Sequence, residues 1–491
     1  MSTAPSRFAL ALLPLTLAAC AVGPNFKSPA APAIPRYTAE VQPAQTAASA
    51  GVGGEAQRFL EGQPLPQRWW HLYGSDKLDG LVDEALRASP TVTAAQAALK
   101  QARENLRAQT ASLLPSFDAN FSGTRQKIDT SSFGNPGGGG TIYNLYNASV
   151  GVTYGLDIWG GARRGVEAQS AQVDYQRYQL DATYSTLIAN VVTAAISEAQ
   201  LRRQIQLQQN IVDDQKRLLT ITERRYDSGG ISRADVLSAR SNLANETARL
   251  PALHQQLTQI RNQLAVYVGK LPGEFSATEF DLDELSLPTE LPLSLPSELV
   301  RQRPDIRAAE AQLHAASANI GVATANLLPQ VTLSGSLGTQ ATSIGNLFTN
   351  NIFTLTGAVA QPLFHGGELT AKRRAAIAAY DQSNAQYRQT VLVAFQNVAD
   401  TLTALYGDAE TLQAQRDASE AAEASLRLTE SQYRLGGASF LTLLNAQMTY
   451  SQTQTSYVQA LAARYQDTAA LIQALGGGWQ PPATGAGAGA R

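Results

Sequence analysis

The pattern of apolar positions in residues 161–268 predicts two long helices joined by a tight turn. Along the first helix, apolar or small residues recur at alternating steps of three and four: Tyr184, Leu187, Val191, Ala194, Leu201, Ile205, Val212, Leu219 and Tyr226. Polar residues interrupt this stripe at Glu198, Gln208, Gln215 and Thr222. The return helix keeps the same rhythm at Leu250, Leu253, Leu257, Ile260, Leu264 and Tyr267. A helix over residues 161–226 extends for roughly 100 Å at about 1.5 Å per residue. This length and the narrow stripe predict a coiled coil or a tube.

The same pattern occurs a second time further along the chain. The run Tyr226-Asp227-Ser228-Gly229-Gly230 returns as Tyr433-Arg434-Leu435-Gly436-Gly437, and Leu113-Leu114-Pro115 returns as Leu327-Leu328-Pro329. Gly269, at the end of the first return helix, corresponds to Gly476. We therefore expect two structural repeats, each with short helices, a strand pair and a long helical hairpin.

Between the short and the long helices the apolar period changes to two, which predicts strands. We expect strands at about residues 116–127 and 142–158, and again at about 330–341 and 352–363. Each has one apolar face and one polar or small face over roughly ten residues, a pattern typical of transmembrane β-barrels. In this interpretation Val152 and Leu333 face lipid, and Thr153 and Thr332 face the lumen. A soluble pair of hairpins with one buried face is the alternative.

Four strands cannot close a barrel, and lipid does not tolerate an open sheet edge. The smallest transmembrane barrels have about eight strands. A membrane-inserted form must therefore contain several copies of the chain: two copies give eight strands and three give twelve.

The beginning of the chain has the features of an export signal. An apolar run follows Arg7 and ends in Leu17-Ala18-Ala19-Cys20, which resembles a bacterial lipobox. We therefore expect residues 1–19 to be removed and Cys20 to be acylated, with Ala21 favouring sorting to the outer membrane. A plain secretory signal is the alternative. Cys20 is the single cysteine, so an intrachain disulfide is excluded. A second apolar run of the roughly 20 residues that a spanning helix needs is not found.

Composition and motifs do not favour an enzyme. The net charge of −2 gives no reason to expect a nucleic-acid partner. The four histidines are scattered without metal-ligand spacing, and the sequence contains neither a P-loop nor a dinucleotide fingerprint. We therefore expect no cofactor, no metal and no catalytic residue, and interpret the chain as a conduit or a scaffold.

These observations divide the chain into six parts. They are a signal peptide (1–19), a lipidated tether (20–67), a first repeat (68–270), a linker (271–303), a second repeat (304–475) and a flexible tail (476–491). The long helices are expected at about 161–226 and 233–268 in the first repeat, and at about 367–433 and 440–474 in the second.

Several short motifs resemble one family. They are Cys20-Ala21-Val22-Gly23-Pro24-Asn25-Phe26, Trp69-Trp70, Asp157-Ile158-Trp159-Gly160-Gly161, Leu295-Pro296-Ser297-Glu298-Leu299, Arg303-Pro304-Asp305-Ile306-Arg307-Ala308-Ala309-Glu310 and Leu363-Phe364-His365-Gly366-Gly367. Together with the doubled Tyr-x-x-Gly turns, they are similar to the TolC family, and more narrowly to the NodT-type lipoproteins of resistance-nodulation-division efflux systems. The resemblance extends over the mature chain.

This resemblance implies an α+β membrane protein that is a homotrimer. A twelve-stranded barrel in the outer-membrane lipid would continue into a long helical barrel in the periplasm, and substrates would come from an inner-membrane pump through a periplasmic adaptor. The turns would be the tips where the adaptor docks, which implies docking residues Gly229, Gly230, Ser232, Gly436, Gly437 and Ser439.

The pore would be narrowest near the same tips, at Ile231, Asp235, Phe440 and Leu441. Many relatives carry charged residues around the second tip, but this chain has Ala438, Ser439, Thr442 and Asn445 there. Asp235 is then the remaining acidic candidate, either as a ring around the symmetry axis or as a simple helix-end residue.

We therefore expect a passive outer-membrane duct that exports small molecules or drugs from the periplasm, anchored by lipid and extending into the periplasm. Two alternatives remain: the outer-membrane duct of a type I protein-secretion system, and a coiled-coil lipoprotein scaffold without a pore.

Overall fold

A computed structural model describes residues 21–128, 140–276 and 278–477 of the chain. The chain forms two compact units. The sheet unit contains residues up to 29, residues 99–176 and residues 309–387. The hairpin unit contains residues 30–98, 177–308 and the chain from 388 onward. None of the helices in the described ranges has the length and apolarity of a membrane span.

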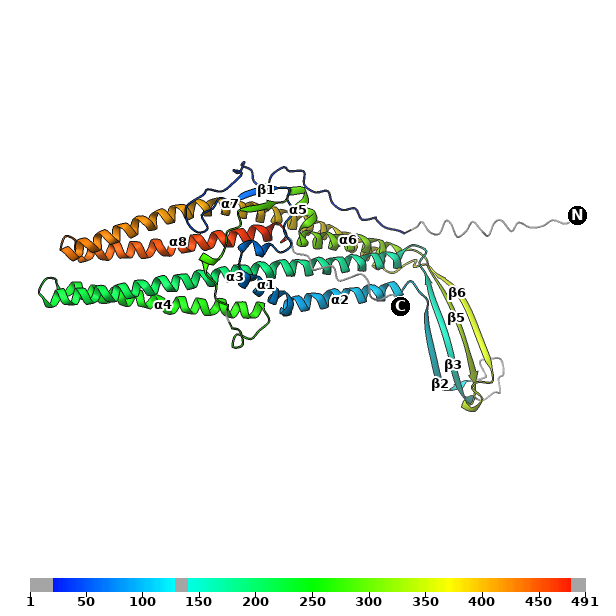
Figure 1. The fold of residues 1–491 in the computed structure, drawn as a ribbon. Helices are drawn as coiled ribbons and strands as arrows, with labels where there is room; N and C mark the ends of the chain where they lie inside the picture. Colours follow the sequence, from blue (N-terminus) through cyan, green and yellow to red (C-terminus); the bar gives the residue numbers. More distant parts are fainter. Residues whose placement is uncertain (1–20, 129–139, 277, 478–491) are drawn as a thin grey trace. The chain divides into compact units, whose positions relative to one another are not determined.

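The sheet unit is built around one antiparallel sheet (Figure 1). Its strands are β2 (Ser116–Ile128), β3 (Thr141–Leu156), β5 (Gln330–Ala341) and β6 (Asn351–Ala360), in the spatial order β2-β3-β5-β6. A short 3-10 helix, η5 (Ile344–Asn346), lies between β5 and β6. The unit also holds most of α6 (Pro304–Ala325), the end of α2 (Pro90–Ala111) and the beginnings of α3 (Gly161–Asp227) and α7 (Glu368–Leu435).

Two strands end earlier than the alternation predicts, for identifiable reasons. β3 stops at Leu156 because the Asp157 carboxylate turns to the start of α3, where it accepts the N–H groups of Ala162 at 3.0 Å and Arg163 at 2.9 Å. A carboxylate at a helix N-terminus satisfies donors that have no partner within the helix. β6 stops at Ala360, two residues before Pro362, which lacks the N–H that a ladder needs.

The hairpin unit is dominated by two helical hairpins (Figure 1). The first joins α3 to α4 (Arg233–Tyr267), and the second joins α7 to α8 (Phe440–Ala474). α3 and α7 contain 67 and 68 residues, and α4 and α8 contain 35 each. The smaller elements are β1 (Arg58–Glu61), η2 (Trp69–Tyr73), α1 (Asp76–Ala88), η4 (Leu282–Glu284), β4 (Glu290–Leu293) and α5 (Pro296–Gln302), with β1 and β4 paired in parallel.

The core of the hairpin unit contains large aromatic side chains. Trp69, Trp70 and Tyr73 are fully buried. The Tyr73 hydroxyl donates to the carbonyl of Tyr465 at 2.8 Å, and the Tyr465 hydroxyl donates to the carbonyl of Leu285 at 2.9 Å. The Trp-Trp motif therefore lies in the core, and Tyr73 ties this segment to α8.

The polar residues in the helical stripe are buried and hydrogen-bonded. The Glu198 carboxylate is completely buried and accepts from the Arg261 guanidinium at 2.8 Å and the Phe280 N–H at 3.1 Å. Gln208 donates to the Glu246 carboxylate at 2.8 Å. Gln215 of α3 donates to the side chain of Gln447 of α8, also at 2.8 Å. Buried polar groups must be paired, so these contacts determine which helices pack together and in which register along their axes.

Candidate functional site: an exposed apolar sheet, two helical tips and an N-terminal strap

The strand register divides the sheet into an apolar and a polar face. Residues directly opposite each other on paired strands share a face. Val152 lies opposite Phe117 and Gly335, and Thr153 lies opposite Ser116 and Ser334. The apolar face carries Phe117, Phe121, Val150, Val152, Tyr154, Val331, Leu333, Leu337, Phe353, Leu355 and Val359. The polar face carries Ser116, Asn120, Ser149, Thr153, Thr332, Ser334, Ser336, Thr354 and Thr356. The sequence pattern assigned Val152 and Leu333 to one face and Thr153 and Thr332 to the other, and the register agrees with that grouping.

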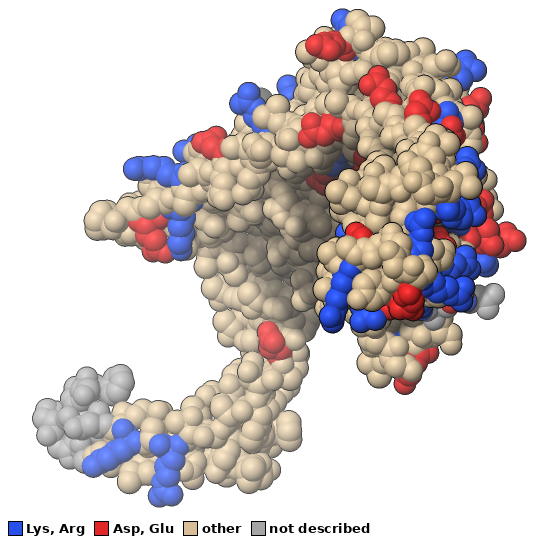
Figure 2. Space-filling view, turned by 90° about the vertical axis from the view of Figure 1, so that its left-hand side faces the viewer, with Lys and Arg blue, Asp and Glu red and all other residues tan. Residues whose placement is uncertain are grey.

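The apolar face is exposed. Phe353 and Leu355 are 82% and 84% exposed, and Phe117 is 70% exposed. The four strands of this sheet, β2, β3, β5 and β6, contain three charged residues, Asp118, Arg125 and Lys127, all in β2. Figure 2 accordingly shows the sheet as a mostly uncharged surface, whereas charged residues are frequent on the helices. An uncovered apolar surface of this kind marks a contact with protein or lipid.

The two outer strands of the sheet have one partner each. β2 pairs with β3 and β6 pairs with β5, so each keeps one edge without a ladder partner among the described residues. Such an edge exposes a row of N–H and C=O groups that another chain can pair with.

The two helical tips have the same construction. Gly229 and Gly436 have left-handed φ angles of 78° and 80°. The next N–H groups, of Gly230 and Gly437, donate back to the carbonyls of Arg225 and Gln432 at 2.8 Å in both tips. A glycine in this conformation satisfies the last carbonyls of the incoming helix and reverses the chain. No atom lies within 4 Å of a side chain added at Gly229 or Gly436, so the φ angle rather than space requires glycine there.

The serines after the glycines are helix caps. The Ser232 hydroxyl accepts from the Asp235 N–H at 3.3 Å, and the Ser439 hydroxyl accepts from the Thr442 N–H at 3.1 Å. The Asp235 carboxylate in turn accepts from the Ser232 N–H at 3.0 Å, which completes a capping box. Asp235 therefore holds the start of α4 through a carboxylate that is fixed in place.

Tyr433, near the end of α7, makes contacts both within its own hairpin and with the first hairpin. Tyr433 packs on Phe440 with ring centroids 6.2 Å apart, and the Arg225 guanidinium lies 4.6 Å above the Tyr433 ring. These two aromatic residues belong to one apolar cluster with Leu218, Ala239 and Leu443. Of this cluster, Phe440 was among the four residues expected at the constriction; it is buried within the chain, whereas, among the other three, Ile231 is half-buried and Leu441 is exposed. Tyr433 was visible in the sequence only as a repeat marker.

A further set of contacts holds residues 21–29, which we call the strap. The buried Arg164 of α3 donates to the Val22 carbonyl at 3.2 Å and to the Asn25 side chain at 2.7 Å. The Val22 N–H donates to the carbonyl of Trp159 at 2.9 Å, so the strap begins at the turn between β3 and α3. A side chain added at Gly23 would lie 2.5 Å from the Cα of Gly321, so strap and α6 approach through two glycines.

A charged group on the helices completes the strap contacts. The Glu167 carboxylate pairs with Arg164 at 2.6 Å and with His314 of α6 at 3.0 Å, and Phe26 stacks on the His314 ring at 4.4 Å. Burial raises the pKa of Glu167, but hydrogen bonds from Arg164 and His314 outweigh it, so this pKa lies below its ordinary value of 4.5. The ionised carboxylate therefore stabilises the cluster above pH 4.5 and loses this effect as the pH falls below it. Sequence reasoning missed this cluster, because its parts are far apart in the chain.

Two expectations concern sites that these contacts do not test. Cys20, the expected acylation site, lies outside the described residues. Within the described ranges, His, Cys, Asp and Glu side chains nowhere gather in threes to form a metal site.

The model of the outer membrane efflux protein family matches residues 81–270 and 295–477. The chain belongs to this family. The pyoverdine export outer membrane protein OpmQ of Pseudomonas aeruginosa is 32% identical over 418 residues, which are 84% of this chain and 88% of OpmQ. The probable efflux pump outer membrane protein TtgC of Pseudomonas putida is 29% identical over 483 residues, 96% of each chain.

Among solved structures, the outer-membrane channel OprN matches with a TM-score of 0.84 at 28% identity, over 94% of this chain and 100% of OprN. Membership of the outer membrane efflux protein family confirms the expected family, the function of an outer-membrane efflux channel and the outer-membrane location. The family consists of channel proteins with a mixed helix-and-strand fold, which argues against a scaffold without a pore.

Proposed function

We propose that three copies of this chain form the outer-membrane duct of a tripartite efflux system. The observation that carries this proposal is the four-stranded sheet with one exposed apolar face and an unpaired edge on each side. In a bilayer every such edge must be paired, which only closure into a barrel achieves. The β6 edge of one copy would then pair with the β2 edge of the next.

The width of the resulting barrel favours three copies over two. Two four-stranded sheets give eight strands, and side chains fill a barrel of about eight strands. Three sheets give twelve strands and a wider interior that can hold water. The polar face, with Thr153 and Thr332, lines this interior, and the apolar face, with Val152 and Leu333, contacts lipid.

The lipid anchor is the second part of the proposal. Residues 1–19 are a signal peptide, and Cys20 carries the acyl chains. The strap contacts support this assignment, because Val22 is held at the turn between β3 and α3. The acyl chains of Cys20 therefore enter the membrane where the strands leave it. The chain then continues as a tether through residues 21–67.

The remaining parts form the periplasmic portion of the duct. It consists of the two repeats at 68–270 and 304–475, the linker at 271–303 and the tail at 476–491. The tips dock a periplasmic adaptor through Gly229, Gly230, Ser232, Gly436, Gly437 and Ser439. Because both tips share one backbone geometry, each copy offers the adaptor two similar surfaces. The pore is narrowest at Ile231, Asp235 and Leu441, with Phe440 supporting the tip from within.

The duct itself is passive, and an inner-membrane pump supplies the energy. The cargo is a small molecule chosen by that pump. The name of OpmQ gives pyoverdine as the substrate that it exports. For this chain we assign only the class of small molecules released to the exterior.

The test is to reconstitute the full-length acylated protein in a planar bilayer. We expect discrete single-channel currents and a mass of three chains by native mass spectrometry. A protein that remains monomeric and shows no conductance, although it is folded by circular dichroism, contradicts the duct.

A further inference from the structure

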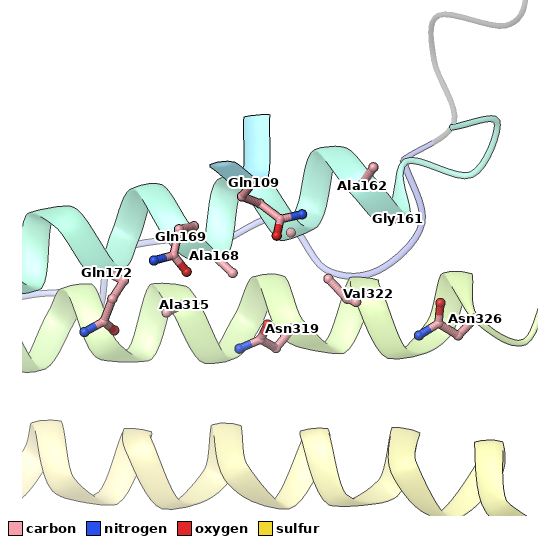
Figure 3. Close-up of a pocket in the computed structure, with 11 residues that line it drawn as sticks. Gln109, Gly161, Ala162, Ala168, Gln169, Gln172, Ala315, Asn319, Val322 and Asn326 are labelled. Atoms are coloured by element: carbon pink, nitrogen blue, oxygen red, sulfur yellow. The ribbon is translucent and has the colours of Figure 1, made fainter. Parts of the chain in front are cut away.

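The sheet unit contains a recess lined by uncharged amides (Figure 3). Its volume is about 470 Å³, and it lies between α2, α3 and α6. Gln109 comes from α2, Gln169 and Gln172 from α3, Asn319 from α6, and Asn326 from the turn directly after α6. The rest of the lining consists of Gly, Ala and Val, so the recess carries hydrogen-bonding groups but no charge.

Close helix packing makes this recess a preformed feature. A side chain added at Gly165 would lie 2.8 Å from the amide nitrogen of Gln109. One added at Gly161 would lie 2.8 Å from the Cβ of Ala325. The two glycines therefore let α2 and α6 approach α3, and the recess remains beside these contacts. A larger residue at Gly161 would press against Ala325 of α6, whereas at Gly165 the flexible end of Gln109 would have to move.

The strap and the recess lie on different sides of the α3–α6 pair. On α3 the strap contacts Arg164, whereas the recess is lined along Gly161, Gly165, Ala168 and Gln172. On α6 the strap side holds His314 and Gly321, whereas the recess side holds Ala315, Asn319 and Val322. At about 100° per residue, the two sets are centred roughly 70° apart around α3 and roughly 120° apart around α6.

The strap identifies which side is outside. It continues from Cys20, whose acyl chains must lie in lipid and thus outside a closed duct. The strap side of α3 and α6 is therefore the periplasmic side. We propose that the recess, on the other face of the α3–α6 pair, is part of the inner wall of the duct, a charge-free zone that binds neutral hydrogen-bonding groups of the passing cargo. This inference rests on the proposed duct and on acylation of Cys20.

The chemistry of the recess defines the ligand class. Side-chain amides donate and accept hydrogen bonds, and they do so without attracting ions of either sign. The hydroxyl, amide and carbonyl groups of a cargo molecule can thus exchange partners along this wall. Since α3 begins five residues after β3 ends, the zone lies just below the strands. Any selection of cargo by charge must then occur elsewhere along the duct.

A single introduced cysteine tests the orientation. Cys20 is the only native cysteine and acylation blocks its thiol, so Asn319→Cys supplies the one free thiol of each copy. Asn319 is exposed on the recess side. The matched control is Ser170→Cys on α3, which is exposed and lies roughly 140° around the helix from the recess. A charged methanethiosulfonate reagent is added to single channels, and mass spectrometry verifies the modification.

We expect the Asn319→Cys channel to lose conductance in up to three steps, and the modified Ser170→Cys channel to keep its conductance. If Ser170→Cys loses current and Asn319→Cys does not, the wall is reversed and the inference is wrong. An Asn319→Cys thiol that fails to react, or reacts without changing the current, also contradicts it, whereas the duct itself stands. Absence of any current from the unmodified protein contradicts the duct instead.

Two further measurements test the chemistry. Asn319→Asp, which keeps the side-chain shape, should shift the reversal potential in a salt gradient toward cation preference, and Ser170→Asp should not. With maltohexaose as a neutral probe, Asn319→Ala should shorten the blocking time about two- to tenfold, as expected for one lost hydrogen bond. An unchanged blocking time contradicts the proposed ligand class.

Discussion

At the scale of single residues, Arg164 makes most of the contacts that hold the strap on α3. It bonds the Val22 carbonyl and the Asn25 side chain and pairs with Glu167. Its side chain is only 6% exposed, so its charge depends on these partners. Neighbouring Arg163 pairs with Asp157 at 3.2 Å but is 40% exposed. These two adjacent arginines offer a comparison between a buried and a solvated ion pair.

We expect Arg164→Ala to release the strap and to destabilise the sheet unit by about 1–3 kcal/mol, because the Val22 carbonyl and the Asn25 side chain lose their donor. Arg163→Ala should cost less than about 1 kcal/mol, as exposed pairs do. Limited proteolysis of the folded protein measures strap release through cleavage within residues 21–29, and thermal unfolding measures stability. Equal protease resistance of Arg164→Ala and the unmodified protein contradicts the role given to Arg164.

A second residue-scale prediction concerns Asp408 of α7. Burial, a hydrogen bond with Asp467 and repulsion from it raise the pKa of Asp408 from 3.8 to about 7, although Arg464 opposes the shift. The folded chain thus binds this proton more tightly than the unfolded chain. The resulting stabilisation is complete below pH 3.8 and is lost as the pH rises through about 7.

Asp408→Asn keeps the hydrogen-bonding shape without the charge, so we expect a higher unfolding temperature at pH 8 and little change at pH 5. The exposed Asp174→Asn serves as control and should not alter the pH profile. Unfolding temperatures between pH 5 and pH 8 measure both effects. A pH profile that is the same for Asp408→Asn as for the unmodified protein shows that this carboxyl does not set it.

At the scale of elements, the sheet separates what the sequence could and could not predict. Alternation between Val152 and Thr153 was sufficient to group the faces, because a strand repeats every two residues. The strand ends were harder to predict from alternation, because they depend on the Asp157 cap and on Pro362. The strap could not be predicted, because nothing local to Arg164 reveals a partner at Asn25. The buried glutamines were visible as polar positions, but their partners follow only from helix packing.

The sheet faces lead to the element-scale prediction. We expect Val152→Arg to impair assembly by about 2–4 kcal/mol, the cost of an arginine on the lipid face near the middle of a bilayer. Thr153→Arg, one residue away on the polar face, should assemble and alter conductance. Trimer yield in outer-membrane fractions, followed by single-channel recording, measures both variants. If both positions tolerate arginine equally, the assignment of faces to lipid and lumen is wrong.

At the scale of the whole molecule, charge is distributed unevenly along the proposed duct. The polar face of the sheet carries one charged residue, Asp118, and the amide recess carries none. At the tips, Asp235 has a carboxylate held by Ser232, whereas the corresponding cap of α8 pairs Ser439 with uncharged Thr442. We therefore expect selection by charge at the first tip, and closure through the apolar contacts around Phe440.

Asp235 and Phe440 separate these two functions. We expect Asp235→Asn to reduce cation preference, because three carboxylates around the axis become neutral while the hydrogen bond from Ser232 can persist. Ser232→Ala removes the cap, with a cost of about 1 kcal/mol, but keeps the charge and should keep the preference for cations.

Phe440→Ala removes the ring that packs on Tyr433 and should raise the resting conductance. Reversal potentials in a salt gradient and open-channel currents give the readout. If Asp235→Asn keeps the cation preference, Asp235 is only a helix cap. If Phe440→Ala keeps the resting current, the constriction does not lie at the tips.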